Sequence, residues 1–265
     1  MTFTAITVTH NSAAHLPQLL ASLAALGPQL IVVDTGSADD GAKIARDHGA
    51  EVIDLPDNPG FGAANNAGVQ RAQHDITALL NPDVIANDAL ARLVAAAERS
   101  DALHVPRLTT PTGRPEDSVH PLPGSLRDLA RAVTPGPLRR AIGERKPAWA
   151  TAAAVVARTA TLKALGPFDP EIFLFGEDLD LGLRARARGI PTVLHRDVEL
   201  VHAGGHSTGA EDIALRVARH RDTVGARLGP AAQQRDDAIQ LLEHAVRAFR
   251  ARDRAYVRAI RAARR

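Results

Sequence analysis

The N-terminal third of the chain alternates short, β-branched apolar runs with segments whose leucines recur at helical spacing. Thr4–Thr9, Leu30–Asp34 and Ile76–Leu80 are typical of strands. The leucines between Leu16 and Leu23 lie on one face of a helix that Gly27 ends. Strands that alternate with helices usually pair in parallel, because each helix carries the chain back across the sheet. We therefore expect an α/β fold, with a mostly parallel sheet flanked by helices.

The alternation stops where prolines gather, since residues 106–147 hold eight of the seventeen prolines in the chain. Such a density favours a long, partly ordered loop, with a short helix near 125–133. Regular structure resumes with a strand over 149–158, a helix that starts near Glu177 and a C-terminal helical region. The expected divisions are 1–105, a Pro-rich loop region 106–147, a second half 148–210 and a basic helical tail 211–265.

Composition excludes several classes of protein. The chain has no cysteine, so disulfides, thiolate catalysis and Cys-based zinc sites are ruled out. Aromatic residues make up only 3%, which leaves few platforms for stacking bases and argues against a nucleic-acid partner. The N-terminus has no signal-peptide pattern, and no apolar run approaches the roughly 18–20 residues that span a bilayer. We therefore expect a cytoplasmic protein.

The C-terminal tail carries most of the basic character. Residues 247–265 contain eight Arg and one acid, Asp253. Two alternatives stay open for this tail: a basic amphipathic helix on the anionic inner face of the cell membrane, or a solvated terminal helix. The apolar residues that would share one face are Val246, Phe249, Val257 and Ile260.

Two acidic segments stand where a sheet of this kind binds ligands. Asn81-Pro82-Asp83 directly follows Ile76–Leu80, and a carboxylate at the carboxyl end of a strand is well placed to hold a divalent cation against a phosphate. Glu177, Asp178 and Asp180 gather at a helix start, where one of them could act as a general base. The plainer alternatives are that Asp83 is a turn residue, and that the acids at the helix start only complement the helix dipole. Together the segments indicate group transfer from a phosphorylated donor.

Three further patterns have both a ligand-binding and a structural interpretation. Asp34 precedes Thr35-Gly36-Ser37, so it can accept from a ribose hydroxyl or a base N–H, or stabilise the turn. The Gly/Asn-rich stretch 58–68 enters a helix and allows close approach of a phosphate, although it is neither a GxGxxG motif nor a P-loop. His202 and His206 flank a Gly pair, which fits metal or phosphate binding as well as a structural role.

The ordered set of motifs resembles that of a known family. The segments are Val8-Thr9-His10-Asn11-Ser12, Val33-Asp34-Thr35-Gly36-Ser37, Asn58-Pro59-Gly60-Phe61-Gly62 with Asn65-Asn66, Leu80-Asn81-Pro82-Asp83, Phe168-Asp169, Phe175-Gly176-Glu177-Asp178-Leu179-Asp180, and His202 with His206-Ser207-Thr208-Gly209. In this order they resemble the family 2 glycosyltransferases of the GT-A fold, especially the bacterial rhamnosyltransferase-like branch that builds cell-wall linkers and polysaccharides. The resemblance covers about residues 3–210 and implies a Rossmann-like sheet.

The resemblance implies a role for each matched position. Residues 1–105 would form the nucleotide-binding half and 148–210 the acceptor and catalytic half. Asp178 would be the catalytic base with Glu177 as its neighbour, and Asp83 and His202 would be the metal ligands. The donor-binding residues would be Thr9, His10, Asn11, Asp34, Gly60, Gly62, Asn65 and Asn81. Candidate contacts to phosphate or acceptor are His206, Ser207, Thr151 and Trp149, of which Trp149 could equally be a core residue.

The implied reaction is direct displacement with inversion, assisted by Mg²⁺ or Mn²⁺. The donor would be a nucleotide-diphosphate sugar, with dTDP-rhamnose favoured by the branch, and the acceptor a glycan, a lipid-linked glycan or a small molecule. Two positions depart from the family pattern: Thr35 replaces a frequent Asn, and Asn81 replaces the first acid of the Asp-x-Asp motif. Two other functions stay open, a nucleotidyltransferase and a catalytically silent nucleotide-sugar-binding protein.

Overall fold

The computed structural model describes residues 2–203 and 210–251 of the chain. Within it the chain forms two compact units, each built from two segments of sequence. The first unit comprises Met1–Ser118 and Ala150–Gly204, and the second comprises Val119–Trp149 and Gly205–Arg265. The expected helical tail therefore belongs to the second unit together with part of the Pro-rich stretch.

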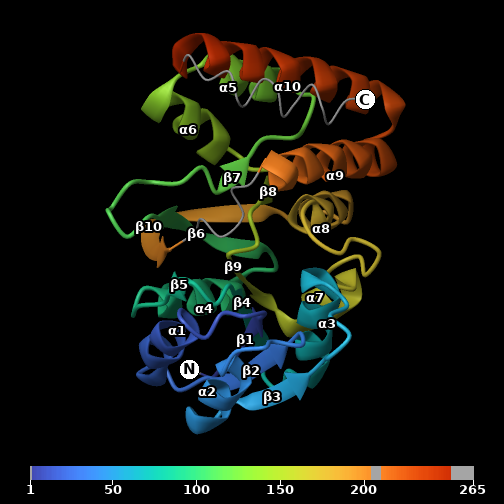
Figure 1. The fold of residues 1–265 in the computed structure, drawn as a ribbon. Helices are drawn as coiled ribbons and strands as arrows, with labels where there is room; N and C mark the ends of the chain where they lie inside the picture. The colour runs from blue at the N-terminus through green and yellow to red at the C-terminus, as the bar shows by residue number, and fades with distance from the viewer. Residues whose placement is uncertain (1, 204–209, 252–265) are drawn as a thin grey trace. The chain divides into compact units, whose positions relative to one another are not determined.

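The first unit is built on a mixed sheet with the strand order β3-β2-β1-β4-β9-β6-β10-β5 (Figure 1). Its first four strands pair in parallel, which confirms the expected α/β fold. Strand β9 then runs antiparallel to both β4 and β6, and β10 pairs in parallel with β6. The bounds are β1 (Thr4–Thr9), β2 (Gln29–Asp34), β3 (Glu51–Asp54), β4 (Ile76–Leu80), β5 (Val84–Ile85), β6 (Leu103–Thr109), β9 (Ala154–Arg158) and β10 (Thr192–His202).

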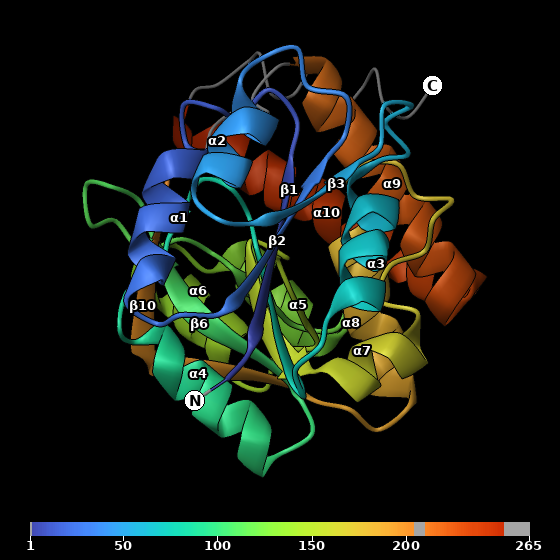
Figure 2. The same cartoon turned by 90° about the horizontal axis from the view of Figure 1, so that it is seen from below.

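Helices cover both faces of this sheet (Figure 2). On one face, Leu19 and Leu23 join Leu90 and Leu93 in a single buried cluster with the strands, because each pair recurs at helical spacing. On the other face the third helix packs on β1 and β2. The bounds are α1 (Leu16–Ala24), α2 (Gly41–Asp47), α3 (Phe61–Arg71), α4 (Leu90–Arg99), α7 (Thr159–Leu165) and α8 (Glu177–Ala187).

The second unit is mainly helical. Its helices are α5 (Leu126–Val133), α6 (Gly136–Glu144), α9 (Ala210–Leu228) and α10 (Pro230–Ala251), and β7 (Val119–His120) pairs with β8 (Trp149–Ala150). Helix α10 packs on α9 and α5, and α5 packs on α6. The C-terminal region is thus, as far as residue 251, a packed element of this unit. Of the four apolar tail residues, Val246 is partly buried, and the other three side chains lie outside the described part.

The structure differs from the sequence-based expectation in the middle of the chain. Residues 106–147, expected as a partly ordered loop, carry the end of β6, the strand β7 and two helices, of which only the helix near 125–133 was foreseen. The single strand expected over 149–158 is two strands, β8 and β9, that belong to different sheets. Across the described residues, each helix is too short or too polar to cross a bilayer.

A glycine sets the approach of α3 to the sheet. A Cβ added at Gly68 would lie 2.5 Å from Cγ2 of Ile6 on β1, so the helix packs at this distance only without a side chain there. Gly68→Ala should lower the free energy of unfolding by about 1–3 kcal/mol, because buried overpacking displaces its neighbours. In an Ile6→Ala background, which removes Cγ2, the same change should cost much less. Urea unfolding of the four proteins measures this coupling, and equal costs in both backgrounds would contradict it.

Candidate active site

Three buried polar atoms mark the carboxyl-terminal edge of the parallel strands. Thr9 ends β1, Asp34 ends β2 and Asn81 directly follows β4, three strands that neighbour one another in the sheet. Thr9 Oγ1, Asp34 Oδ1 and Asn81 Oδ1 are buried and have no hydrogen-bond partner among the described residues. An unsatisfied buried polar atom costs about 1–3 kcal/mol, so three at one edge of the sheet indicate a site that a polar ligand completes.

The loops after β1 and β2 are tied to each other around this edge. His10 Nδ1 lies 3.0 Å from the carbonyl oxygen of Thr35, and Thr35 Oγ1 donates to the carbonyl of Thr9. Asn11 has a φ of 51°, and its Oδ1 accepts from the backbone N–H of Ala38. These bonds give His10, Asn11 and Thr35 a structural role beside Asp34.

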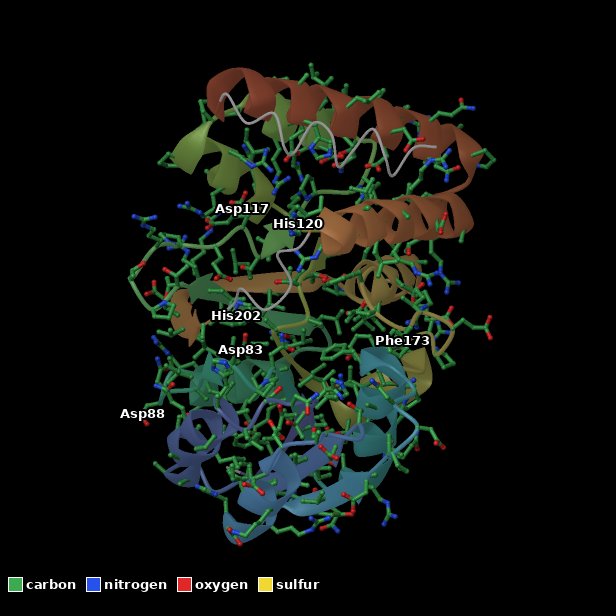
Figure 3. All side chains as sticks on the ribbon, in the orientation of Figure 1. Asp83, Asp88, Asp117, His120, Phe173 and His202 are labelled. Carbon is green, nitrogen blue, oxygen red and sulfur yellow. The ribbon has the colours of Figure 1, made fainter. Side chains whose placement is uncertain are left out.

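The two expected metal ligands, Asp83 and His202, lie side by side (Figure 3). Strand β10 extends to His202, which is opposite Val84 of β5, so His202 Nε2 comes within 3.4 Å of Asp83 Oδ1. His202 Nδ1 lies 2.9 Å from Oε2 of Glu116. Burial lowers the pKa of His202, but the bonds to Asp83 and Glu116 outweigh that effect and raise it to about 9.

Sequence reasoning missed Glu116. Its backbone N–H donates to the carbonyl of Leu108, so it sits on a short return segment beside the end of β6, within the stretch read as a loop. No sequence signal separates it from the neighbouring Asp117. A carboxylate on one imidazole nitrogen fixes the ring orientation and the tautomer, and so aims the other nitrogen.

The donor set at this position fits Mg²⁺ or Mn²⁺. Asn81 supplies a buried amide oxygen without a partner in the described chain, Asp83 a carboxylate and His202 an imidazole nitrogen. Oxygen ligands with one imidazole suit these cations, which keep open positions for water and phosphate. Within the described ranges, no three His, Asp or Glu side chains are arranged so that they alone could hold a metal ion. The protein thus provides only part of the ligands that such a cation needs.

Gly60 and Gly62 of the Gly/Asn-rich stretch both face protein. Gly60 has a φ of 94°, and a Cβ there would lie 2.5 Å from the carbonyl oxygen of Phe173, which also accepts from the backbone N–H of Phe61. A Cβ on Gly62 would lie 2.8 Å from Cβ of Phe168. The glycines therefore allow the N-terminal end of α3 to press against the segment that leads into α8.

Asn65 and Asn66 of this stretch are both engaged within the protein. Asn66 makes a paired contact, in which its Oδ1 accepts from the N–H of Phe168 and its Nδ2 donates to the carbonyl of the same residue. Asn65 is buried, and its Nδ2 donates to the carbonyl of Phe61. The loop and the segment around Phe168 and Phe173 are thus one packed structure.

The carboxylates at the start of α8 differ in their surroundings. Asp180 is fully buried and accepts from Arg184 Nε at 2.7 Å, which is a structural ion pair. Glu177 is also buried, whereas Asp178 is partly exposed and accepts from the N–H of Leu179. The helix is preceded by two residues with positive φ, Phe175 and Gly176. Of the three acids, Asp178 is the one that an acceptor could reach.

Four candidate residues remain, and two of them fall outside the described residues. Trp149 belongs to the second unit, where its ring stacks on His120 with centroids 4.0 Å apart and tilts toward His220. The N–H of Thr151 donates to the carbonyl of Ser118. His206 and Ser207 fall outside the described residues.

Comparison with known sequences identifies similar proteins. A family model described as glycosyl transferase family 2 matches residues 4–142. An uncharacterized glycosyltransferase of Mycobacterium tuberculosis is 35% identical over 76% of this chain and 84% of its own length. The N-acetylglucosaminyl-diphospho-decaprenol L-rhamnosyltransferase of Mycobacterium tuberculosis is 27% identical over 82% of this chain and 81% of its own length.

Solved structures share the fold. A mannosyltransferase from Pyrobaculum calidifontis, in complex with GDP-Man and Mn²⁺, superposes with a TM-score of 0.62 at 16% identity, over 98% of this chain and 72% of its own. A glucosyl-3-phosphoglycerate synthase from Mycobacterium tuberculosis was solved with Mn²⁺, UDP and glucosyl-3-phosphoglycerate. It superposes with a TM-score of 0.62 at 19% identity, over 85% of this chain and 79% of its own. These likenesses confirm the expected GT-A fold.

Replacing Glu116 should remove the carboxylate that pairs with Nδ1 of His202. In metal-free protein, Glu116→Gln should lower the pKa of His202 and reduce the free energy of unfolding by about 0.5–1.5 kcal/mol. The bonds favour protonated His202, so their contribution is complete below the unfolded-state pKa of about 6.5 and disappears as the pH rises through about 9. The difference between the proteins should therefore shrink above pH 9. NMR titration of His202 and urea unfolding in chelator measure both effects, with exposed Asp88→Asn as the control; an unchanged His202 pKa would contradict the assignment.

Proposed function

Because this chain belongs to the family 2 glycosyltransferases, we propose that it transfers a sugar from a nucleotide-diphosphate donor to an acceptor hydroxyl with inversion. One observation carries the proposal: three buried, unsatisfied polar atoms end neighbouring parallel strands beside the Asp83–His202 pair. This edge of an α/β sheet is where nucleotides bind. The proposal gives Thr9 Oγ1 and Asp34 Oδ1 a partner on the donor, and Asn81 Oδ1 a partner in the cation.

The donor would occupy the edge formed by β2, β1 and β4. Asp34 Oδ1 and Thr9 Oγ1 would bond to the base or ribose, because both are buried hydrogen-bonding atoms without a partner among the described residues. His10, Asn11 and the Gly60–Phe61 turn would shape the walls around them, since their own polar groups are engaged within the protein. Asn65 would hold the first turn of α3 rather than contact the nucleotide.

Asn81, Asp83 and His202 would hold Mg²⁺ or Mn²⁺. When bound, the cation supplies positive charge that offsets the negative charge developing on the departing nucleoside diphosphate. Glu116 would keep the His202 ring aimed at this position. The replacement of the usual first acid by Asn81 leaves the site with one carboxylate fewer, so part of the cation's coordination would come from the donor.

Asp178 would act as the general base. As the acceptor oxygen bonds to the anomeric carbon, the bond from that carbon to the diphosphate oxygen breaks, and the hydroxyl proton passes to the Asp178 carboxylate. The partial exposure of Asp178 and its place at the start of α8 support this role, while buried Glu177 would support the turn beside it. The helix N-terminus also stabilises a carboxylate.

The substrates are proposed from the relatives. The similar rhamnosyltransferase acts on a decaprenol-linked N-acetylglucosaminyl diphosphate, so we propose dTDP-rhamnose as donor and a polyprenyl-diphosphate-linked glycan as acceptor. The proposed location is the cytoplasm at the inner face of the membrane. Nucleotidyl transfer is the second candidate, and it would release pyrophosphate instead of a nucleoside diphosphate.

Donor binding should depend on Asp34. Asp34→Asn should weaken donor affinity by about tenfold or more, because a buried hydrogen bond to a charged group contributes about 1.5–3 kcal/mol. Asp54→Asn is the matched control, since Asp54 ends the neighbouring strand β3, lies opposite Asp34 in register and is exposed. Thermal shift with a panel of nucleotide sugars, with and without Mn²⁺, measures binding. Equal shifts for wild type and Asp34→Asn would contradict the assigned donor site.

Turnover should depend on Asp178. Asp178→Asn should reduce the transfer rate by about 100-fold or more with donor affinity unchanged, since general-base catalysis contributes about 10²–10⁴-fold. Glu171→Gln, an exposed acid on the same segment, should transfer at the wild-type rate. Nucleoside diphosphate release with a lipid-linked acceptor measures the rate. Normal transfer by a folded Asp178→Asn protein would show that the base lies elsewhere, and pyrophosphate release would favour the second candidate.

A further inference from the structure

Helix α5 in the second unit is packed with its polar side inward. Asp128, Arg131 and Ala132 are its buried residues, whereas Leu126, Leu129 and Val133 are exposed. The three exposed residues stand at positions i, i+3 and i+7, which form one stripe along a helix. An ordinary surface helix of a soluble protein has the opposite arrangement, so the exposed stripe calls for a partner.

The inward side chains explain why the helix keeps this orientation. Arg131 and Arg139 both lie within 4 Å of the Glu243 carboxylate on α10, and all three side chains are largely buried. The Asp128 side chain accepts from the N–H of Gly124. Burial, and to a smaller extent the charge of Asp236, raises the pKa of Asp128 to about 6. Rotating α5 would break these interactions, so its leucines stay outside.

Helix α6, which packs on α5, also carries an exposed leucine. Leu126 is 86% exposed, and Leu138 on α6 is 64% exposed. Figure 1 shows α5 and α6 as neighbours within this unit, and the two helices pack on each other. We call the set of Leu126, Leu129, Val133 and Leu138 the α5–α6 face.

The rim of the α5–α6 face is basic. Residues 126–146 contain six Arg or Lys and two acids. Asp128, Arg131 and Arg139 are used inside the unit, which leaves Glu144 as the acid near the surface. The four other basic residues are exposed or partly exposed: Arg127, Arg140, Arg145 and Lys146. Arg127 donates to the carbonyl of Arg145, so the basic residues at the start of α5 and the end of α6 lie together.

We propose that the α5–α6 face docks the protein onto an anionic lipid bilayer, with its leucines at the boundary of headgroups and acyl chains and its basic rim on the phosphates. Apolar side chains beside Arg and Lys are the combination that binds such an interface. A second copy of this chain on the same face would bring the two basic rims together, which disfavours a dimer. The inference rests on the proposed function in one respect, since a lipid-linked acceptor gives the docking its purpose.

The test is co-sedimentation of the full chain with large unilamellar vesicles. Vesicles of phosphatidylcholine with an equal part of phosphatidylglycerol should bind the wild-type protein, and vesicles of phosphatidylcholine alone should bind it at least about tenfold more weakly. The double variant Leu126→Ser/Leu138→Ser should lose about tenfold or more in binding to anionic vesicles. Arg145→Glu/Lys146→Glu should lose a similar factor, and high salt should remove the charge-dependent part.

Matched controls separate this face from the rest of the surface. Leu215→Ser changes another exposed leucine of the same unit, and Lys163→Glu changes an exposed lysine of the first unit. Both should bind vesicles as the wild type does. All four variants change exposed or solvent-facing side chains, so unchanged melting temperatures should confirm that they fold.

Three results would overturn the proposal. The first is wild-type protein that does not bind anionic vesicles. The second is normal binding by the leucine double variant, which would place any membrane contact outside the α5–α6 face. A dimer in light scattering that the leucine changes dissociate would assign the face to a second copy. Donor thermal shift without vesicles is read in parallel, so loss of docking is distinguishable from failure of the proposed transferase function.

Discussion

The register of β1 between β2 and β4 is the constraint on which the candidate site depends. Thr9 pairs with Asp34 across β1 and β2, and Ile6 pairs with Leu79 across β1 and β4. A slip of one residue would turn every side chain to the opposite face of the sheet. The buried side chains of Ile6 and Ile31 resist such a slip, so the hydrophobic core fixes where the three unsatisfied polar atoms meet.

The sequence indicated the first half of the fold well because its signals are local. Strand and helix boundaries up to Leu80 follow from β-branched runs, leucine spacing and glycine stops, each visible within a few residues. The prolines of 106–147 predicted a loop, and that prediction was wrong. A proline such as Pro106 can lie within a strand where the pairing with neighbouring strands tolerates it. Helix α5 was foreseen, but its inverted packing depends on Glu243, more than 100 residues further along the chain.

The candidate site shows the same limit. Asp34, Asp83 and His202 could be selected from sequence, since each stands beside a strand end or a glycine pair. Glu116 could not, because its importance arises from a fold that returns it to His202, 86 positions away. The glycines at 60 and 62 were read as room for a ligand, whereas their missing side chains make room for Phe173 and Phe168. A glycine in a sequence indicates that another group comes close to the backbone, but it does not show whether that group is a ligand or another part of the protein.

The segment between α7 and α8 would link the proposed donor site to the proposed general base. It is held at Phe168 by Asn66, at Phe173 by the Gly60–Phe61 turn, and at Pro167 by Arg184, which also binds buried Asp180. The first two contacts come from the loop that would border the donor, and the third comes from the helix that carries Asp178. Since rigid support on both sides fixes the position of a general base, a change at Gly60 would disturb Asp178 without touching it. These contacts join the Gly/Asn-rich stretch and the start of α8, although the two are more than 100 residues apart in sequence.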